Sequence, residues 1–331
     1  MRRAPGNRRR VSRWAEAPAW VVLAACSAAS AAWAVGQAIG DRWVWSQALY
    51  WTPAWAALVA SMLGLGAAGL LPRGRRSRVL GTWVMVAAAL LSAARFLRWE
   101  VGWALTAFPS EGAALTVTHW NPQWPGAAAL ESGRALSTIL GDVTIVSNPG
   151  SILRSAVADD WVPPGWAVRD HGHFAVVSRL PVVECSVLLF TSVPRVGLVW
   201  LGWVEVESPG AGRIGILVAD LPSNPRLARG AVAEALAALV PPALGGRVPD
   251  LVVGDLNCTP GSTVWDALAP GMDAAPPWRS RGWMATFKRP WPVLRIDAAL
   301  VGPRLRWRRA ESVDLGIGEH RAQRCAFEPV S

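Results

Sequence analysis

The chain has 331 residues, of which 52% are apolar, and a formal net charge of +10. This length suffices for two or three folded units. The charge is uneven: residues 1–107 carry 13 arginines against three acids, which leaves 20 basic and 20 acidic residues for 108–331. The net charge of the longer part therefore gives no argument for a nucleic-acid partner.

Three apolar runs come first, and each has a length near the roughly 20 residues with which a helix crosses a hydrocarbon core. The first run ends before Asp41, and the third contains only Arg95, near its end, where the side chain can reach the interface. Buried globular helices, or a cleaved signal peptide for the first run, are the alternatives. The series of three runs predicts instead a basic tail at 1–17 and a membrane anchor at 18–107, with helices at about 18–40, 51–71 and 79–97.

Arginine placement predicts the orientation of this anchor. Six arginines lie in the first 13 residues and four in 72–78, whereas the loop between the first two runs holds only Arg42. Loops rich in Lys and Arg stay in the cytoplasm. We therefore expect a multi-pass protein of the cell membrane with a cytoplasmic N-terminus and an extracytoplasmic C-terminal domain. Tryptophans near the predicted interfaces fit an aromatic belt: Trp20, Trp43, Trp45, Trp51 and Trp99.

The sequence of residues 108–331 predicts many short strands interrupted by few helices. This pattern and length indicate one α+β domain. Residues 224–241 have helical spacing, with Asn224 as the cap and Pro225 at the first helical position. A second, shorter helix is expected at 261–268. Strands are predicted at 114–120, 143–147, 173–178, 182–190, 197–207, 213–219, 250–255, 295–301 and 322–328.

The four cysteines of the chain have no CxxC spacing, which argues against a zinc site. The sequence does not decide whether Cys185 and Cys325 form a disulfide.

Polar side chains interrupt or end several of these apolar strands. Asp255 and Asn257, two residues apart in LVVGDLN, share one face of an extended chain. An aspartate there can align or deprotonate a water, and an asparagine can hold a phosphate oxygen. Asp297, within RIDAALV, needs a partner if buried, and His320 is a candidate because a carboxylate fixes an imidazole tautomer. Asn121 follows LTVTHW. Taken singly, each residue also fits a structural role, such as a turn asparagine or a surface histidine.

In this order, these residues resemble the endonuclease/exonuclease/phosphatase superfamily. The resemblance covers roughly 113–331 and is carried by GDLNCTPGS (254–262), GHFAVVSRLPVVE (172–184) and TFKRPWPVLRIDAALVG (286–302). It implies a four-layer αββα sandwich, that is, two packed β-sheets flanked by helices, after three transmembrane helices. It also implies hydrolysis of phosphate esters with Mg²⁺ or Mn²⁺. Membrane-anchored bacterial members are similar to this layout.

The resemblance further implies roles for single residues. Asn121 matches a metal-site asparagine. Asp255 matches the acid that activates water, and Asn257 matches the asparagine that orients the phosphate. Asp297 matches the acid that supports the terminal histidine, and His320 matches that histidine, which contacts the scissile phosphate.

Three positions depart from the family pattern. The central metal ligand of the family is a glutamate six residues after the aspartate of its second strand. Here Asp142 is followed by Asn148, which offers a carbonyl oxygen without the negative charge that magnesium favours. The substrate-facing histidine or tyrosine of the family is Asp220, which is also a candidate replacement ligand. The closing acid is the longer Glu319, which the resemblance places at the metal.

Three functions therefore compete. The first is a metal-dependent hydrolase, with the metal held by Asn121, Glu319 and either Asn148 or Asp220. The second is a catalytically inactive family member that binds a ligand or partner, and the third is a structural membrane protein. The residues around Asp255 favour the first, the departures favour the second, and nothing specific favours the third. Because the anchor binds the lipid bilayer, a lipid headgroup, nucleotide or small phosphodiester is a better substrate expectation than nucleic acid.

Overall fold

The computed structural model describes residues 13–72, 76–109, 115–154 and 161–330. The chain forms two compact units, one of residues 1–39 and 52–96 and one of residues 40–51 and 97–331. The second unit thus includes residues 40–51, which the sequence pattern assigned to the anchor. Most of the predicted basic tail, residues 1–12, lies outside the described residues, as do residues 73–75 of the arginine-rich loop.

The first unit is helical and contains α1 (Arg13–Ile39), α3 (Ala54–Leu70) and most of α4 (Arg76–Trp99). Of the helices that the structure describes, two are long and apolar enough to cross a membrane, at Glu16–Ile39 and Arg76–Trp99. The helix α3 has 17 residues and reaches spanning length only if it is counted together with α2 (Val44–Trp51). The helix predicted at 51–71 is therefore present, but it counts as a third span only as part of this bent pair. Pro53 explains the break, because proline cannot continue the helix and restricts the residue before it.

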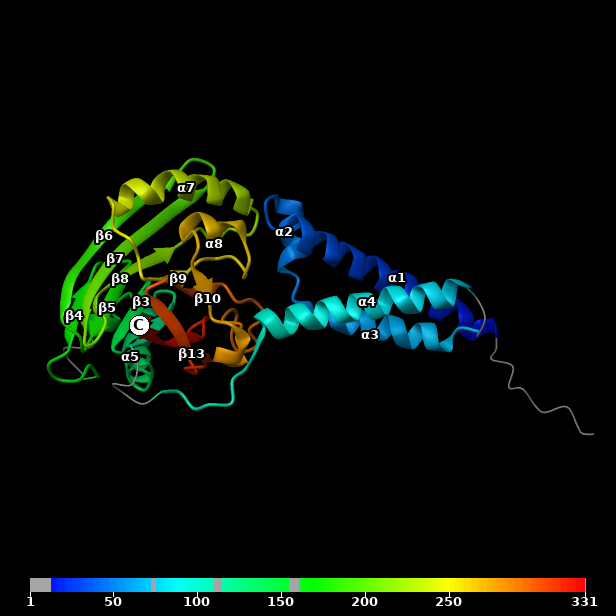
Figure 1. Cartoon of the computed structure of the whole chain (residues 1–331), viewed down its shortest axis with the longest axis horizontal. Helices are drawn as coiled ribbons and strands as arrows, with labels where there is room; N and C mark the ends of the chain where they lie inside the picture. The colour runs from blue at the N-terminus through cyan, green and yellow to red at the C-terminus, as the bar shows by residue number, and fades with distance from the viewer. Residues whose placement is uncertain (1–12, 73–75, 110–114, 155–160, 331) are drawn as a thin grey trace, which may run out of the picture. The chain divides into compact units, whose positions relative to one another are not determined.

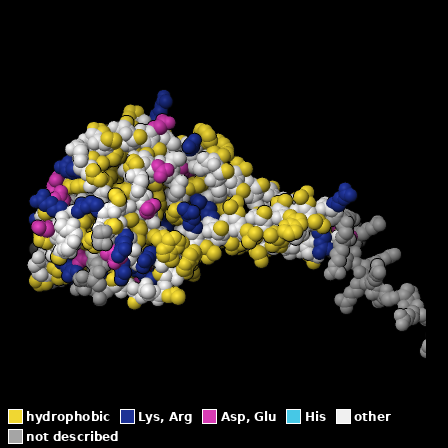
Figure 2. All heavy atoms as spheres, viewed as in Figure 1, with side chains coloured by type: hydrophobic (Ala, Val, Ile, Leu, Met, Phe, Trp, Pro, Cys, Tyr) yellow, Lys and Arg dark blue, Asp and Glu magenta, His cyan; other side chains and the backbone are white. Residues whose placement is uncertain are grey.

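Small residues let the helices of the first unit approach closely, as in membrane helix pairs. A Cβ atom on Gly64 of α3 would lie 2.3 Å from the sulfur of Met85 in α4. Figure 2 shows charged side chains spread over the second unit, whereas the visible faces of α1, α3 and α4 are mostly hydrophobic.

The second unit is built on two β-sheets (Figure 1). The eight-stranded sheet has the order β1-β11-β13-β14-β2-β3-β5-β4, and the six-stranded sheet has the order β10-β12-β9-β8-β7-β6. The strands of the eight-stranded sheet are β1 (Val101–Trp103), β11 (Ser280–Trp283), β13 (Leu305–Val313), β14 (Ala322–Pro329), β2 (Leu115–Trp120), β3 (Val143–Ser147), β5 (Phe174–Ser178) and β4 (Ala167–Asp170). Those of the six-stranded sheet are β10 (Asp273–Ala274), β12 (Asp297–Val301), β9 (Leu251–Asp255), β8 (Gly212–Asp220), β7 (Gly197–Ser208) and β6 (Val182–Val193).

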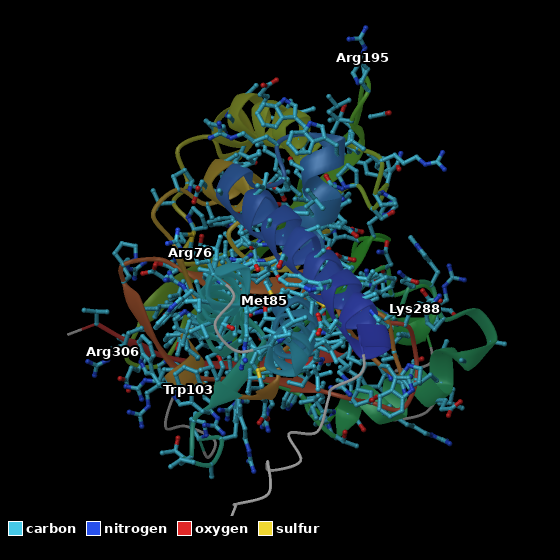
Figure 3. All side chains as sticks on the ribbon, turned by 90° about the vertical axis from the view of Figure 1, so that its right-hand side faces the viewer. Arg76, Met85, Trp103, Arg195, Lys288 and Arg306 are labelled. Atoms are coloured by element: carbon cyan, nitrogen blue, oxygen red, sulfur yellow. The ribbon has the colours of Figure 1, made fainter. Side chains whose placement is uncertain are left out.

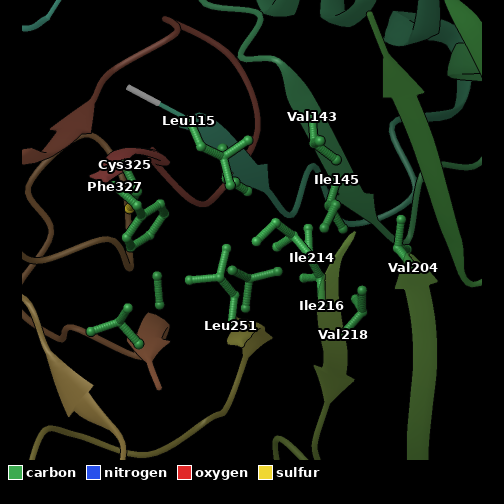
Figure 4. Packing of buried hydrophobic residues seen from close by; sticks show 14 of the residues in the cluster. Leu115, Val143, Ile145, Val204, Ile214, Ile216, Val218, Leu251, Cys325 and Phe327 are labelled. Carbon is green, nitrogen blue, oxygen red and sulfur yellow. The ribbon is translucent and has the colours of Figure 1, made fainter. Parts of the chain in front are cut away.

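Buried apolar side chains from both sheets form one central core, part of which is drawn in Figure 4. Ile145 of β3 and Phe327 of β14 share this core with Ile216 of β8 and Leu251 of β9. The helices α7 (Arg229–Leu244) and α8 (Thr263–Leu268) cover the outer face of the six-stranded sheet, and α5 (Ala129–Ser137) covers the outer face of the other. The predicted four-layer α+β sandwich is confirmed.

All nine predicted strands are present, although residue 114 of the first lies outside the described residues. The strand β13 was missed because LRWRRAESV is rich in charge. The short helix predicted at 261–268 is confirmed as α8, which Ser262 caps by accepting from Val264 N at 3.2 Å. The predicted start of the long helix is wrong: α7 begins at Arg229, and Asn224 Oδ1 instead closes a turn by accepting from Arg226 N at 2.9 Å. All four cysteines are free.

Candidate active site

Three aspartates lie in a row at one edge of the six-stranded sheet because of its register. Asp220 is opposite Asp255 in the parallel pair β8–β9, and Asp255 is opposite Asp297 in the antiparallel pair β9–β12. Gly254 makes the close approach of β8 and β9 feasible, since a Cβ atom there would lie 1.8 Å from Ala219 O. The backbone pairing therefore aligns the three carboxylates before any side-chain contact is considered.

Three nitrogen-bearing side chains come from neighbouring strands of the other sheet. His320 precedes β14, Asn121 follows β2, and Asn148 follows β3. Each of them contacts one aspartate of the row. The three pairs are His320 Nδ1 with Asp297 Oδ2 at 2.8 Å, Asn121 Nδ2 with Asp255 Oδ2 at 2.9 Å, and Asn148 Nδ2 with Asp220 Oδ2 at 2.8 Å.

A tight turn after β9 holds the central pair. The backbone N–H of Asn257 donates to Asp255 Oδ1 at 3.1 Å, and Asn257 Nδ2 donates to Leu221 O at 2.8 Å. The φ angles of Asn257 and Asn148 are 48° and 49°, in the left-handed region that costs energy for residues other than glycine. The surrounding hydrogen bonds hold both residues there, a situation that is frequent at functional sites.

Sequence reasoning missed two residues beside the row. Gln123, with a φ of 56°, donates its backbone N–H to Asn121 Oδ1 at 3.0 Å, and its Nε2 lies 3.0 Å from His320 Nε2. His119 is buried behind the site, with Nε2 3.0 Å from Ser147 Oγ. Gln123 follows Asn121 by two residues in an ordinary turn sequence, and His119 lies inside an apolar strand, where its pattern resembles that of a core residue.

Burial and neighbouring charge shift the pKa values of His320 and His119 in opposite net directions. Burial alone would lower the pKa of His320, but the adjacent Asp297 carboxylate outweighs it and raises that pKa to about 9. Burial raises the pKa of Asp297, and the charge and hydrogen bond of His320 outweigh it, so the net direction is downward. His119 is dominated by burial, which lowers its pKa to about 4. His320 and Asp297 therefore form a charged pair, and His119 is neutral.

In the described part of the chain, the carboxylates of Asp220 and Asp255 have no such strong pairing with a positive charge. Burial raises the pKa of Asp220 to about 6, against the hydrogen bond from Asn148, and the charge of Asp297 raises it further. Burial, followed by the charge of Asp297, raises the pKa of Asp255 well above its usual range. A positive charge beside Asp220 and Asp255 would favour their ionised forms and lower both pKa values.

A cavity of about 850 Å³ opens onto this edge of the sheets. The asparagines and two of the aspartates line its floor, whereas Asp297 and His320 lie outside its lining and have side-chain exposures of 1%. Arg195 and Arg226 lie in its wall, and Arg195 projects outward from the turn between β6 and β7 (Figure 3). The other wall residues include the aromatic side chains Trp124, His173 and Trp200.

Two ligand sets compete for a divalent cation. Asp255, Asp297 and His320 have ligand atoms within 4.8 Å of one another. However, His320 Nδ1 is already bound to Asp297, and both residues lie away from the cavity. We favour the cavity, where the carboxylates of Asp220 and Asp255 accept from the side-chain amides of Asn148 and Asn121, because Mg²⁺ and Mn²⁺ prefer hard oxygen ligands with access to water and substrate.

Glu319, the third predicted metal ligand, lies differently. Its side chain is 44% exposed and forms an ion pair with Lys288, in which Nζ and Oε1 are 2.9 Å apart. Among the described residues it makes no hydrogen bond or ion pair with the row of aspartates.

No family model and no curated protein matches the chain. Among solved structures, it is similar to an endonuclease/exonuclease/phosphatase from Beutenbergia cavernae, at 18% identity and a TM-score of 0.45 over 65% of this chain and 71% of that one. It is also similar to the 3′ phosphatase NExo from Neisseria bound to product DNA hairpin, at 15% identity and a TM-score of 0.45 over 65% of this chain and 100% of that one. A third similar structure is ANGEL2, a 2′,3′-cyclic phosphatase, at 10% identity and a TM-score of 0.45 over 70% of this chain and 97% of that one.

Proposed function

We propose that this chain is a membrane-anchored, divalent-metal-dependent phosphoesterase of the endonuclease/exonuclease/phosphatase superfamily. The observation that carries the proposal is the row of three aspartates, each bound to one nitrogen side chain of the opposite sheet, of which Asp220 and Asp255 line the cavity. Such an arrangement holds hard cations and positions a water, and both are needed to hydrolyse a phosphate ester.

The catalytic roles follow from the contacts. Asp255 faces the cavity and accepts the proton of the attacking water. Asn257 fixes that carboxylate through its backbone N–H. Asp297 keeps His320 protonated and oriented, with His320 Nε2 3.8 Å from Asp255 Oδ2. The imidazolium stabilises the negative charge that develops on the phosphate.

The residues that would hold Mg²⁺ or Mn²⁺ are Asn121, Asn148 and Asp220, and Asp255 lies beside them as the base. A bound cation would neutralise the phosphate oxygens and polarise the phosphorus toward attack. Asn148 brings an amide where the family has a carboxylate, but it lies against Asp220, so a carboxylate is present beside that position. This contact favours the active enzyme over the inactive binding domain.

The substrate that we propose is a small phosphate ester, such as a lipid headgroup or a nucleotide. Arg195 and Arg226 lie in the cavity wall and form no ion pair with any residue that the structure describes, so both are free to bind an anionic group of the substrate. The arginine clusters before α1 and between α3 and α4 support an extracytoplasmic domain, which requires α3 to cross the membrane together with α1 and α4.

The test is hydrolysis of bis-p-nitrophenyl phosphate by the full chain in detergent micelles, with Mg²⁺, Mn²⁺ or EDTA. We expect metal-dependent turnover that Asp255→Ala lowers by about 10³-fold, because the variant loses the group that takes the proton of water. Asp273→Asn, an exposed substitution in β10, is the matched control. Turnover that persists in EDTA or in Asp255→Ala would contradict the assignment.

A further inference from the structure

The short helix α2 belongs to the catalytic unit, although the chain enters it from α1 and leaves it toward α3. Gln47 and Tyr50 are three residues apart and therefore lie on the same face of α2. Both side chains are buried, with exposures of 1% and 5%. Gln47 Nε2 donates to Pro225 O at 2.9 Å, and Tyr50 Oη donates to Pro260 O at 2.7 Å.

Arg229 adds a third contact of the same kind. This buried side chain donates from one terminal nitrogen to Pro222 O at 2.7 Å. Residues 41–51 hold Arg229 in place. The backbone N–H of Arg229 donates to Asp41 O at 3.2 Å, and the Arg229 guanidinium lies 5.0 Å from the centre of the Trp51 ring. Three backbone carbonyl groups of two loops are thus held from residues 41–51. Gln47 and Tyr50 bind two of them directly, and Arg229 binds the third.

These two loops build the cavity. Residues 221–228 contain Leu221, Pro222 and Arg226, which line it, and residues 255–262 begin with Asp255 and Asn257 at its floor. Asn257 Nδ2 connects them through its hydrogen bond to Leu221 O. Turn bonds such as Leu227 N to Asn224 O and Ser262 N to Thr259 O shape the two loops from within, and the side chains of α2 and Arg229 bind them from outside.

We propose that Gln47 and Tyr50 are positioning residues, which hold the two active-site loops in place from α2. The proposal rests on the function proposed above, and it gives α2 a part in catalysis. Its chemical basis is that each side chain donates a hydrogen bond to the carbonyl of a proline in one of the two loops. Small displacements of reacting groups lower turnover steeply, by up to about 10²-fold for about 1 Å.

The test uses the full chain in detergent micelles with Gln47→Leu, Tyr50→Phe and the double variant, because a fragment beginning at residue 108 lacks α2 altogether. Both substitutions keep the size of the side chain and remove its hydrogen bond. Val44→Ala, on the same helix with Val44 46% exposed, is the control. We expect kcat of the double variant to fall about tenfold, with a smaller change in KM, and Val44→Ala to match the wild type.

Hydrogen exchange followed by mass spectrometry gives a second readout that does not depend on turnover. We expect faster exchange in 221–228 and 255–262 of the double variant and unchanged exchange in β5. If the wild type shows no turnover, the proposed function fails, and the exchange result still decides whether the brace exists. Unchanged loop exchange, or faster exchange throughout the domain, would overturn the brace.

Discussion

The two sheets of the second unit contribute different side chains to the same candidate site. The six-stranded sheet supplies Asp220, Asp255 and Asp297, and the eight-stranded sheet supplies the nitrogen atoms of Asn121, Asn148 and His320 that bind them. The first set is aligned by strand register, whereas the second comes from loops that follow or precede strands. Backbone pairing therefore positions the three acids, whereas their contacts with the opposite sheet determine how far their negative charge is compensated.

The pairs also differ from one another. His320 compensates Asp297 with a positive charge, whereas the amides of Asn121 and Asn148 leave Asp255 and Asp220 under-compensated. A charged pair therefore lies at one end of the row, and the cation site that we propose lies at the other.

The largest expected effect concerns the strand pairing that aligns the acids. Gly254→Ala places a Cβ atom 1.8 Å from Ala219 O, so β8 and β9 must separate. We expect a loss of about 3 kcal/mol in the free energy of unfolding, measured by denaturant titration of the full chain in detergent. Gly271→Ala, with no atom near the added methyl group, is a control for added bulk, although its positive φ makes a small loss expected there too. Equal losses of unfolding free energy in Gly254→Ala and Gly271→Ala would mean that the pairing of β8 with β9 tolerates the added methyl group.

The next effect concerns the charged end of the row. Asp297→Asn keeps the shape of the side chain and removes the charge that holds the proton on His320. We expect kcat to fall about 10²-fold with little change in KM, because the imidazolium acts on the developing charge of the transition state. Steady-state kinetics with bis-p-nitrophenyl phosphate measure this. An unchanged kcat would exclude His320 from the chemistry.

The other end of the row can be tested by moving one carboxylate from one sheet to the other. Asp220→Asn removes the charge, and we expect the metal concentration for half-maximal turnover to rise about tenfold or more. The double variant Asn148→Asp with Asp220→Asn restores one carboxylate and one amide in the opposite order. We expect it to recover most of the loss. Equal behaviour of the single and double variants would show that the carboxylate of this pair does not serve the metal.

The smallest effect concerns pH. His119 has a folded-state pKa of about 4, below the ordinary histidine pKa of 6.5, so the unfolded state binds the proton first, and stability falls as pH drops from 6.5 toward 4. His320 has the opposite sign: its stabilising effect is full below pH 6.5 and is lost as pH rises toward 9. We expect His119→Asn to be relatively more stable than the wild type in acid, by about 1 kcal/mol at pH near 5.5. Thermal unfolding of both proteins against pH measures the difference, which must vanish above pH 6.5.

Much of the fold and half of the site could be predicted from sequence. Asp255, Asp297 and Asn121 each interrupt or end an apolar strand, so their position at a sheet edge was visible locally. The contact between Asn148 and Asp220 was not, because these residues are 72 positions apart and lie in different sheets. Glu319 had an overlooked signal: neighbouring residues of an extended chain face opposite ways, so a buried His320 turns Glu319 outward.

The brace by α2 was also beyond the sequence pattern. An apolar segment rich in tryptophan suggests a membrane interface, and only the fold reveals that Gln47 and Tyr50 bind Pro225 and Pro260. Long-range partners of this kind leave no local period in the sequence.

Calorimetric titration of Mn²⁺ into the full chain and into Asp220→Asn tests directly whether the Asp220 end of the row holds a divalent cation. We predict saturable binding by the wild type that is at least about tenfold weaker in the variant. Absence of binding by the wild type, or equal affinity in the two proteins, would contradict the account.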